Sequence, residues 1–225
     1  YYCFGCNASG TAIAFLMEYL RMDFVEAVED LASRAGMEVS REPGSSFDQT
    51  NQSAKLYELM ESATKYYSDQ LKNNKNNIIN YLKKRNINKE TAIEFELGFA
   101  PPGWDNLIIN LGKSKELIEE LLDTGAIIKN DRGSYYDRFR DRLMFPIRDQ
   151  RGRVIGFGGR VLNNKTPKYL NSPETRIFQK GRELYGLFQA RKSTKNLSEL
   201  YIVEGYMDVI ALAQFGIKNV VATLG

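Results

Sequence analysis

The strongest constraint on the fold is a strand–helix–strand pattern near the end of the chain. The apolar run 200–203 predicts a buried strand, residues 206–214 have helical spacing, and residues 220–222 predict a second strand. Two strands joined through one helix pair in parallel, with a right-handed crossover. The sequence therefore predicts a βαβ unit here, which places this part of the protein in the α/β class.

Residues 53–197 have a different pattern, which predicts an α+β region. Two apolar runs, 143–148 and 154–161, flank a polar turn and predict an antiparallel hairpin. Helices are expected from Ser53 onward and over residues 77–84, 88–96 and 114–123. The predicted fold class is therefore α+β in the middle of the chain and α/β at its end.

Residues 41–52 lack a hydrophobic period and predict a linker after a small first region, residues 1–40. The chain begins at Tyr1 without a Met and stops at Gly225, just after a predicted strand, so we expect a piece of a longer protein. No apolar run approaches the roughly 20 residues that span a bilayer, so no membrane role is expected. Two cysteines close together fit a reducing cytoplasm better than a disulfide framework.

The charge of the chain is unevenly distributed. The net charge is +3, yet residues 132–182 hold thirteen Lys or Arg against four acids, a local charge of +9, which leaves −6 elsewhere. Ten of the thirteen are Arg, which makes forked contacts with phosphate, and aromatic residues are interleaved with them. This segment favours a polyanion-binding surface, with an ordinary solvated face as the alternative. The chain has no histidine, which excludes His-based catalysis and metal binding within these residues.

Cys3 and Cys6 have the Cys-x-x-Cys spacing of half a structural zinc site, with Gly5 suited to a tight knuckle. A redox pair or two idle thiols are the alternatives, although a redox motif normally opens a helix directly. Tetrahedral zinc needs four ligands, and these two cysteines supply only half of them.

Two acids follow the first strand of the predicted βαβ unit. Glu204 stands where the strand ends, next to Gly205, and Asp208 lies one helical turn later. Open parallel sheets place functional groups at this edge, and Mg²⁺ takes oxygen ligands of this kind. The alternative for Asp208 is an acid that simply stabilises a helix start.

The segment from Gly156 to Asn171 offers groups that suit a nucleotide. The glycines at 156–159 allow close approach of another backbone or a ligand, but no helix or Walker lysine follows, so a P-loop is not expected. Lys168, Tyr169 and Asn171 supply a cation, a ring and an amide within four positions. A nucleotide contact and a rigid turn remain equal alternatives for this loop.

Seven short motifs occur in order along the chain. They are Cys3-Phe4-Gly5-Cys6, Gly98-Phe99-Ala100-Pro101-Pro102-Gly103-Trp104, Tyr136-Asp137-Arg138-Phe139-Arg140, Phe145-Pro146-Ile147-Arg148-Asp149, Gly156-Phe157-Gly158-Gly159-Arg160, residues 167–175 and Val203-Glu204-Gly205-Tyr206-Met207-Asp208. Together they closely resemble bacterial DNA primases of the DnaG type. The resemblance implies the end of a zinc-binding domain (1–40), a linker (41–52), the N-terminal subdomain of an RNA polymerase core (53–197) and the start of a Toprim domain (198–225).

The resemblance also implies roles for single residues. Cys3 and Cys6 match zinc ligands, Glu204 matches the first Toprim acid used with Mg²⁺ or Mn²⁺, and Asp208 matches the next acid. Arg160 and Lys168 match basic residues near the nucleotide, and we group Asn171 with them. The positions expected to meet template DNA are Arg85, Trp104, Arg138, Arg140 and Lys180.

These matches imply a DNA primase, a nucleotidyltransferase that joins ribonucleoside triphosphates on single-stranded DNA. The implied partner is a replicative helicase, bound through a further domain, and a monomer is expected. The family's remaining zinc ligands and Toprim aspartates have no match in these residues, so we expect the chain alone to be inactive. The alternatives are a non-catalytic single-stranded DNA-binding module and a part of a primase–helicase.

Overall fold

The computed structural model describes residues 1–20, 22, 24–37, 39, 46–73, 78–162, 166–193 and 197–224. The chain divides into two compact units, Tyr1–Ala54 and Lys55–Gly225. Within the described ranges, no helix is both long enough and apolar enough to cross a membrane.

The first unit is small. A bridge between Tyr2 and Ser9 closes its initial loop, and helices α1 (Ala12–Tyr19) and α2 (Phe24–Ala35) follow. The hydroxyl of Thr11 caps α1 by accepting a hydrogen bond from the backbone N–H of Ala14 at 3.1 Å. The core of this unit consists of Leu16, Met22 and Ala27 with partly buried neighbours.

Helix α3 (Ser46–Asn73) begins inside the segment predicted as a linker. Residues 46–52 were assigned to the linker but are helical, while residues 40–45 lie outside the described residues. A helix that is already nucleated extends at one hydrogen bond per residue, so its first turns need no apolar stripe of their own. For that reason the hydrophobic period, which starts near Leu56, placed the helix start too late.

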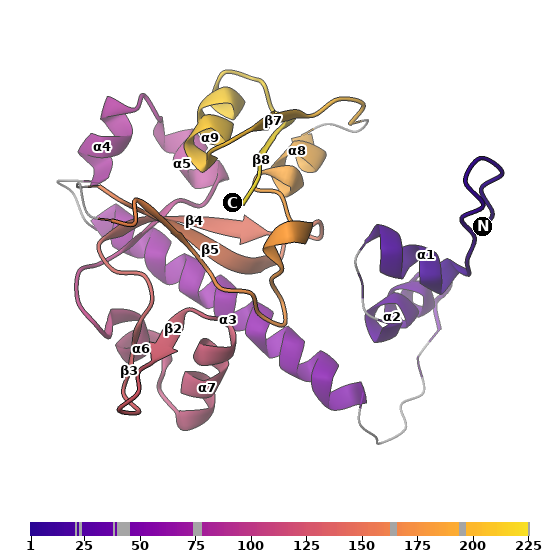
Figure 1. Ribbon diagram of the computed structural model, residues 1–225, viewed down its shortest axis with the longest axis horizontal. Coiled ribbons are helices and arrows are strands. Elements are labelled where there is room, and N and C mark those ends of the chain that lie inside the picture. Colours follow the sequence, from indigo (N-terminus) through magenta and orange to yellow (C-terminus); the bar gives the residue numbers. More distant parts are fainter. Residues whose placement is uncertain are drawn as a thin grey trace. The chain divides into compact units, whose positions relative to one another are not determined.

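The second unit contains a four-stranded antiparallel sheet in the order β1-β4-β5-β6, of which Figure 1 labels the central strands β4 and β5. Its strands are β1 (Gly98–Ala100), β4 (Arg142–Arg148), β5 (Val154–Val161) and β6 (Tyr169–Asn171). The predicted hairpin is confirmed as β4–β5, in which Phe145 lies opposite Gly158. A separate two-stranded ribbon pairs β2 (Ile127–Lys129) with β3 (Tyr135–Asp137).

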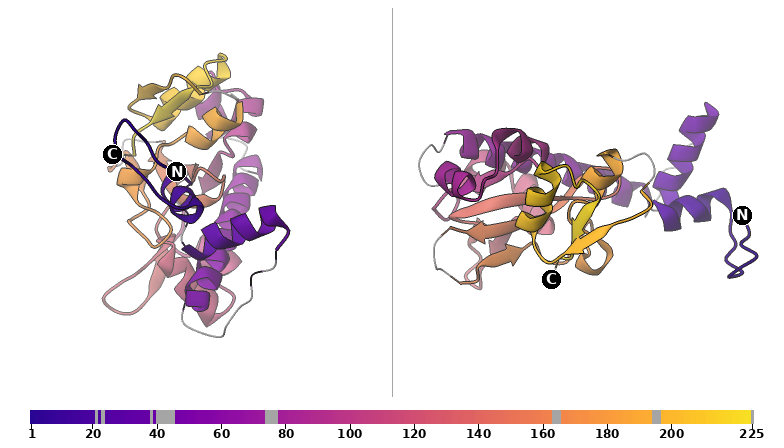
Figure 2. Two further views of the ribbon diagram at one scale, coloured as in Figure 1. Left: turned by 90° about the vertical axis from the view of Figure 1, so that its right-hand side faces the viewer. Right: turned by 90° about the horizontal axis from the view of Figure 1, so that it is seen from above.

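The predicted βαβ unit is also confirmed. Strands β7 (Tyr201–Val203) and β8 (Val220–Ala222) pair in parallel, and α9 (Tyr206–Gln214) connects them. These elements stay together as one yellow group in both views of Figure 2. The remaining elements are α4 (Ile78–Lys84), α5 (Lys89–Glu94), α6 (Asn106–Leu111), α7 (Lys115–Asp123), the 3-10 helix η1 (Lys180–Arg182) and α8 (Leu187–Ser193).

Two apolar cores cover the two faces of the sheet. One contains side chains of α4, α9 and β8, and the other contains side chains of α3, α6 and α7. Neighbouring glycines of β5 mark the two faces, because Gly158 faces the ring of Tyr206 and Gly159 faces the ring of Phe139. Figure 1 shows α3 along one side of β4 and β5, and α9 on the other.

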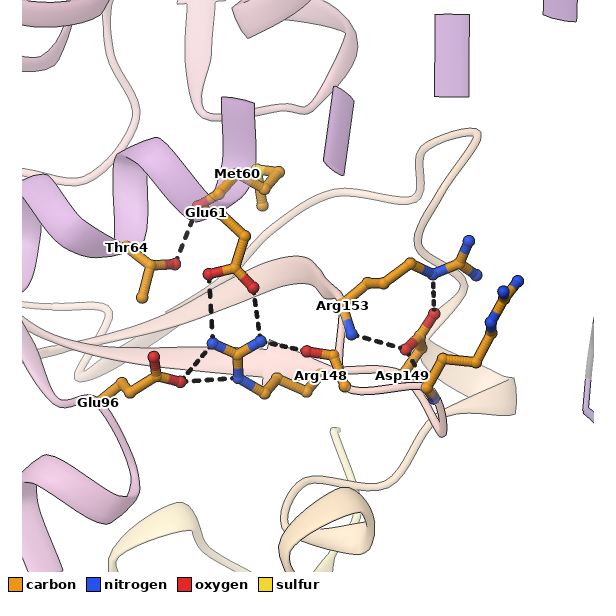
Figure 3. Close-up of polar contacts among 9 residues, drawn as sticks. Met60, Glu61, Thr64, Glu96, Arg148, Asp149 and Arg153 are labelled. Carbon is orange, nitrogen blue, oxygen red and sulfur yellow. Dashed lines mark hydrogen bonds and ion pairs between the residues drawn. The ribbon is translucent and has the colours of Figure 1, made fainter. Parts of the chain in front are cut away.

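A buried arginine ties α3 to the sheet. The guanidinium of Arg148, whose side chain is 9% exposed, contacts the carboxylates of Glu61 on α3 and Glu96 after α5 (Figure 3). It also donates to the carbonyl of Gly152 in the β4–β5 turn. One side chain thus joins three segments that are distant in the sequence.

Candidate functional site

The turn that carries Glu204 and Asp208 is fixed to the sheet by Tyr206, the first residue of α9. The side chain of Tyr206 is buried, and its hydroxyl donates a hydrogen bond to Oδ1 of Asn171 at 2.8 Å. Burial raises the pKa of the Tyr206 phenol, and the bond to Asn171 lowers it by less, so the phenol stays protonated. Its ring packs against Gly158, where an added Cβ atom would lie 2.2 Å from Cε2 of Tyr206. A glycine at position 158 therefore allows this close approach of α9 to β5.

Arg160 lies on the same face of β5, two residues beyond Gly158. Only 6% of the residue is exposed, and its guanidinium lies 5.1 Å from the ring centroid of Tyr81 and 5.3 Å from that of Tyr169. Tyr169 is the cross-strand neighbour of Arg160 on β6, and Tyr81 comes from α4. The two rings hold the cation by cation–π contacts. Nε of Arg160 has no hydrogen-bond partner among the described residues.

Both acids of the predicted metal site lie next to the carboxyl end of β7. Glu204 follows β7 and Asp208 lies in the first turn of α9, and both residues are exposed. Burial raises the pKa of the Tyr169 phenol, Arg160 lowers it, and the charge of Asp208 raises it, so Asp208 and Arg160 act on the same phenol. Among the described residues, no group of three or more acids and cysteines is close enough to hold a metal ion.

Asn171 connects the sheet to the βαβ unit. Its Nδ2 donates to the carbonyl of Leu224 at 2.6 Å while its Oδ1 accepts from Tyr206. Its own carbonyl accepts from Nε of Arg138 at 3.3 Å. The sequence left a nucleotide contact and a rigid turn open for the loop before it, and these bonds favour a positioning role for the Asn171 amide.

Lys168 is exposed, and its backbone is held in place. Its carbonyl accepts from the N–H of Val161 at 3.1 Å. The buried Arg142 donates to the carbonyls of Gly159 and Pro167, each at 3.1 Å. The backbone at Pro167 and Lys168 is therefore anchored, and exposed Lys168 directly precedes Tyr169, the first residue of β6.

An aromatic platform forms around Arg140. Its guanidinium lies 4.3 Å from the ring centroid of Trp104 and 5.3 Å from that of Tyr136, and the two rings meet edge-to-face at 5.7 Å. Trp104 is 65% exposed. We call Trp104, Tyr136 and Arg140 the aromatic platform. An exposed indole beside an arginine can stack on a nucleic-acid base and pair with its phosphate.

The other residues expected to meet DNA are distributed around these two places. Arg85 lies 5.7 Å from the ring of Tyr81, which also contacts Arg160, and Arg138 reaches Asn171. Lys180 is separate, because it begins η1, where its backbone N–H donates to Glu174. Tyr81 and Tyr206 were not predicted as functional residues. For Tyr81, the one available signal was its i, i+4 spacing from Arg85, which places the two side chains on the same face of a helix.

The basic segment contributes less surface charge than its composition suggests. Arg142 is buried, Arg148 binds two glutamates, and Arg153 pairs with Asp149 at 2.7 Å. These three arginines hold the hairpin together. The predicted polyanion-binding surface would therefore depend on fewer cations than the thirteen of the segment.

Cys3 and Cys6 lie in the initial loop of the first unit, and both are exposed. The backbone N–H groups of Cys6 and Gly5 point to the Cys3 sulfur and lower the pKa of its thiol. Such N–H groups stabilise a thiolate, which is the form that binds a metal. Two exposed thiols, one of them with a lowered pKa, have the donor chemistry of two ligands of a structural zinc site.

Comparison with known proteins agrees with this arrangement. The family model for the DNA primase catalytic core, N-terminal domain, matches residues 66–191, which is more than half of the chain. This chain belongs to the bacterial DnaG-type DNA primases. The CHC2 zinc finger model matches residues 1–47, and a Toprim domain model matches residues 198–225. The predicted family and fold class are therefore confirmed, whereas the predicted domain limits stay a prediction.

The relatives extend beyond this chain. It is 53% identical to a DNA primase of Pseudomonas aeruginosa and 52% identical to that of Escherichia coli K12, with all of the chain covered. The chain spans 35% and 39% of the length of these two curated relatives.

Among solved structures, the DnaG primase catalytic domain bound to ssDNA is 52% identical, with a TM-score of 0.75, over 78% of this chain and 55% of that chain. The Aquifex aeolicus primase, with zinc-binding and RNA polymerase domains, is 38% identical, with a TM-score of 0.69, over 100% of this chain and 54% of that one.

Proposed function

We propose that this chain is the part of a DNA primase that holds single-stranded template DNA and presents an incoming ribonucleotide to the Toprim acids. The observation that carries the proposal is the packing of Tyr206 against Gly158 and its hydrogen bond to Asn171. These contacts bring the Glu204–Asp208 turn to the face of the sheet that carries Arg160. The ssDNA bound to the related DnaG catalytic domain supports the template assignment. The whole reaction is primer synthesis by nucleotidyl transfer, in the bacterial cytoplasm.

In this proposal each group has a separate task. Arg160 and Lys168 attract the triphosphate, and the rings of Tyr81 and Tyr169 keep Arg160 from reorienting when it binds. Glu204, with Asp208 beside it, holds Mg²⁺ or Mn²⁺, which when bound lowers the charge cost of hydroxyl attack on the α-phosphate. Asn171 holds the sheet and the acidic turn in register.

Cys3 and Cys6 supply two ligands of the structural zinc in the first unit. Their knuckle and the match to the CHC2 zinc finger support this assignment. The replicative helicase is the proposed partner of the whole protein, as expected from the family.

The aromatic platform, together with Arg85, Arg138 and Lys180, is proposed to hold the template. We expect Arg140→Ala to weaken the binding of a fluorescent single-stranded oligonucleotide about tenfold, because both a phosphate contact and the support of Trp104 are lost. Fluorescence anisotropy at several salt concentrations measures the effect. The slope of log affinity against log salt should also fall by about 0.7, the value for one phosphate of a single strand.

Arg132→Ala is the matched control, because it removes the same charge from the exposed turn between β2 and β3. It should change the affinity less than twofold, since the aromatic platform does not include it. Equal losses in the two variants would mean that only net charge matters, and the aromatic platform would then have no specific role.

A further inference from the structure

Asp137 occupies the centre of the segment that builds the aromatic platform, and only 2% of it is exposed. Its carboxylate accepts hydrogen bonds from the backbone N–H groups of Leu107 at 2.7 Å and Ile108 at 3.2 Å. These are first-turn groups of α6, which have no partner inside the helix. Asp105, at the N-cap position itself, makes no side-chain cap bond. The cap of α6 therefore comes from β3, thirty residues further along the chain.

The backbone of Asp137 contacts both ends of the aromatic platform. Its N–H donates to the carbonyl of Trp104 at 2.6 Å, and its carbonyl accepts from Nη1 of Arg140. Asp137 also follows Tyr136 directly on β3. One residue thus bonds to the segment before α6, to the start of α6 and to the arginine between the two rings.

We propose that Asp137 is a positioning residue for template DNA: its buried carboxylate fixes the start of α6, and its backbone thereby holds Trp104 and Arg140 in the geometry that binds a base and its phosphate. This inference rests on the proposed function of the aromatic platform. Asp137 itself has no contact with the nucleic acid in this proposal, because its carboxylate is buried and bound to the start of α6.

Electrostatics alone predicts the opposite effect. Loss of an acid near a DNA-binding surface raises the local positive charge and strengthens binding to phosphate. If Asp137 positions the aromatic platform, its loss weakens binding despite that gain. The sign of the change therefore separates the two accounts.

The test uses the only tryptophan of the chain, Trp104, as an internal probe. At pH 8 we expect Asp137→Ala to lower the anisotropy of Trp104 emission without DNA and to weaken binding of a single-stranded oligonucleotide at least fivefold. Asp131→Asn, in the exposed β2–β3 turn, is the control for charge and should leave both readouts unchanged or tighten binding slightly. Circular dichroism checks that each variant is folded.

Two results would overturn the inference: unchanged Trp104 anisotropy in Asp137→Ala, or binding as tight as that of the unaltered chain. If Asp137→Ala does not fold, Asp137→Asn decides, since it keeps one acceptor and should give a smaller change of the same sign. If DNA leaves the Trp104 emission of the unaltered chain unchanged, the proposed platform fails, while the DNA-free anisotropy still judges the role of Asp137.

The same carboxylate predicts a response to pH. Burial raises the pKa of Asp137 to about 6, the two backbone bonds lower it, and Asp105 raises it while Arg140 lowers it. The phenols of Tyr66 and Tyr67 on α3 also face it, and both have raised pKa values. Histidine, which ordinarily titrates in this range, is absent from the chain. We expect the anisotropy of Trp104 emission to change near pH 6, and this change should be absent in Asp137→Asn. If the change persists in Asp137→Asn, a group other than Asp137 causes it.

The stability of the fold should change in the same range. The folded pKa of Asp137 lies above its ordinary value of 3.8, so the folded state binds more protons than the unfolded state between about pH 4 and 6. The free energy of unfolding of the unaltered chain, compared with that of Asp137→Asn, should therefore fall as pH rises through this window. Urea unfolding at pH 4.5 and 7 measures the difference, and a constant difference would contradict the assignment.

Discussion

Gly158→Ala is expected to destabilise the second unit by about 3 kcal/mol, although alanine ordinarily suits a strand better than glycine does. The added methyl group would lie 2.2 Å from Cε2 of Tyr206, a distance that no packed structure tolerates. Tyr206 is buried against Phe145, Tyr169 and Tyr185, so its ring has no space to withdraw without moving the start of α9. The variant should therefore unfold at lower urea concentration.

The matched control is Gly181→Ala, because an added Cβ there meets nothing within 4 Å and the backbone needs no positive φ. It should change the free energy of unfolding by less than about 0.5 kcal/mol. Tyr206→Phe separates packing from hydrogen bonding, since it removes only the bond to Asn171 and should cost about 1 kcal/mol. Equal stability of Gly158→Ala and Gly181→Ala would show that α9 does not depend on this close approach.

The regular parts of the fold were predictable because they depend on local patterns. The β4–β5 hairpin and the β7–α9–β8 unit each follow an apolar period that is readable within about 25 residues. Helix α7 was predicted over residues 114–123, and in the structure Ser114 caps it by accepting from the N–H of Leu117 at 3.2 Å. These elements would carry the same signal in almost any protein.

Two short elements, α6 and β6, were not predicted, because distant residues stabilise them. Helix α6 has six residues, and its cap is Asp137 on β3. Strand β6 has three residues and exists because β5 pairs with it. Neither has a hydrophobic period of its own, so the sequence pattern contains no signal for it.

The candidate functional residues also divide into those with a local sequence signal and those whose role depends on distant partners. Glu204 and Asp208 were predicted from their place at a strand end, which the topology confirms. The role of Asn171 stayed open because its partners, Tyr206 and Leu224, lie 35 and 53 residues away. The sequence also does not show what surrounds an arginine. Arg160 is buried between the rings of Tyr81 and Tyr169, whereas Arg148 binds the half-exposed carboxylates of Glu61 and Glu96.

Arg148→Met should destabilise the second unit by about 2 to 3 kcal/mol, because it removes one donor group from three acceptors at once. The guanidinium forms ion pairs with Glu61 and Glu96, and it also donates a hydrogen bond to the carbonyl of Gly152 (Figure 3). The two carboxylates are 46% and 40% exposed, so water recovers part of the loss, and the cost stays below that of a fully buried pair. Methionine keeps most of the volume, so the measured change reports polar contacts more than packing.

Lys72→Ala is the matched comparison, because Lys72 lies on the same helix α3 and forms an exposed pair with Asp69 at 3.0 Å. Its loss should cost less than about 0.5 kcal/mol. In a double-mutant cycle, Glu61→Gln should destabilise the unaltered chain but have little further effect in Arg148→Met, since its partner is already absent. Additive losses would show that Glu61 and Arg148 act independently. Coupled losses would mean that one arginine holds α3 against the β4–β5 hairpin. Arg148 would then support, from the opposite face, the sheet that carries Arg160 and packs against Tyr206.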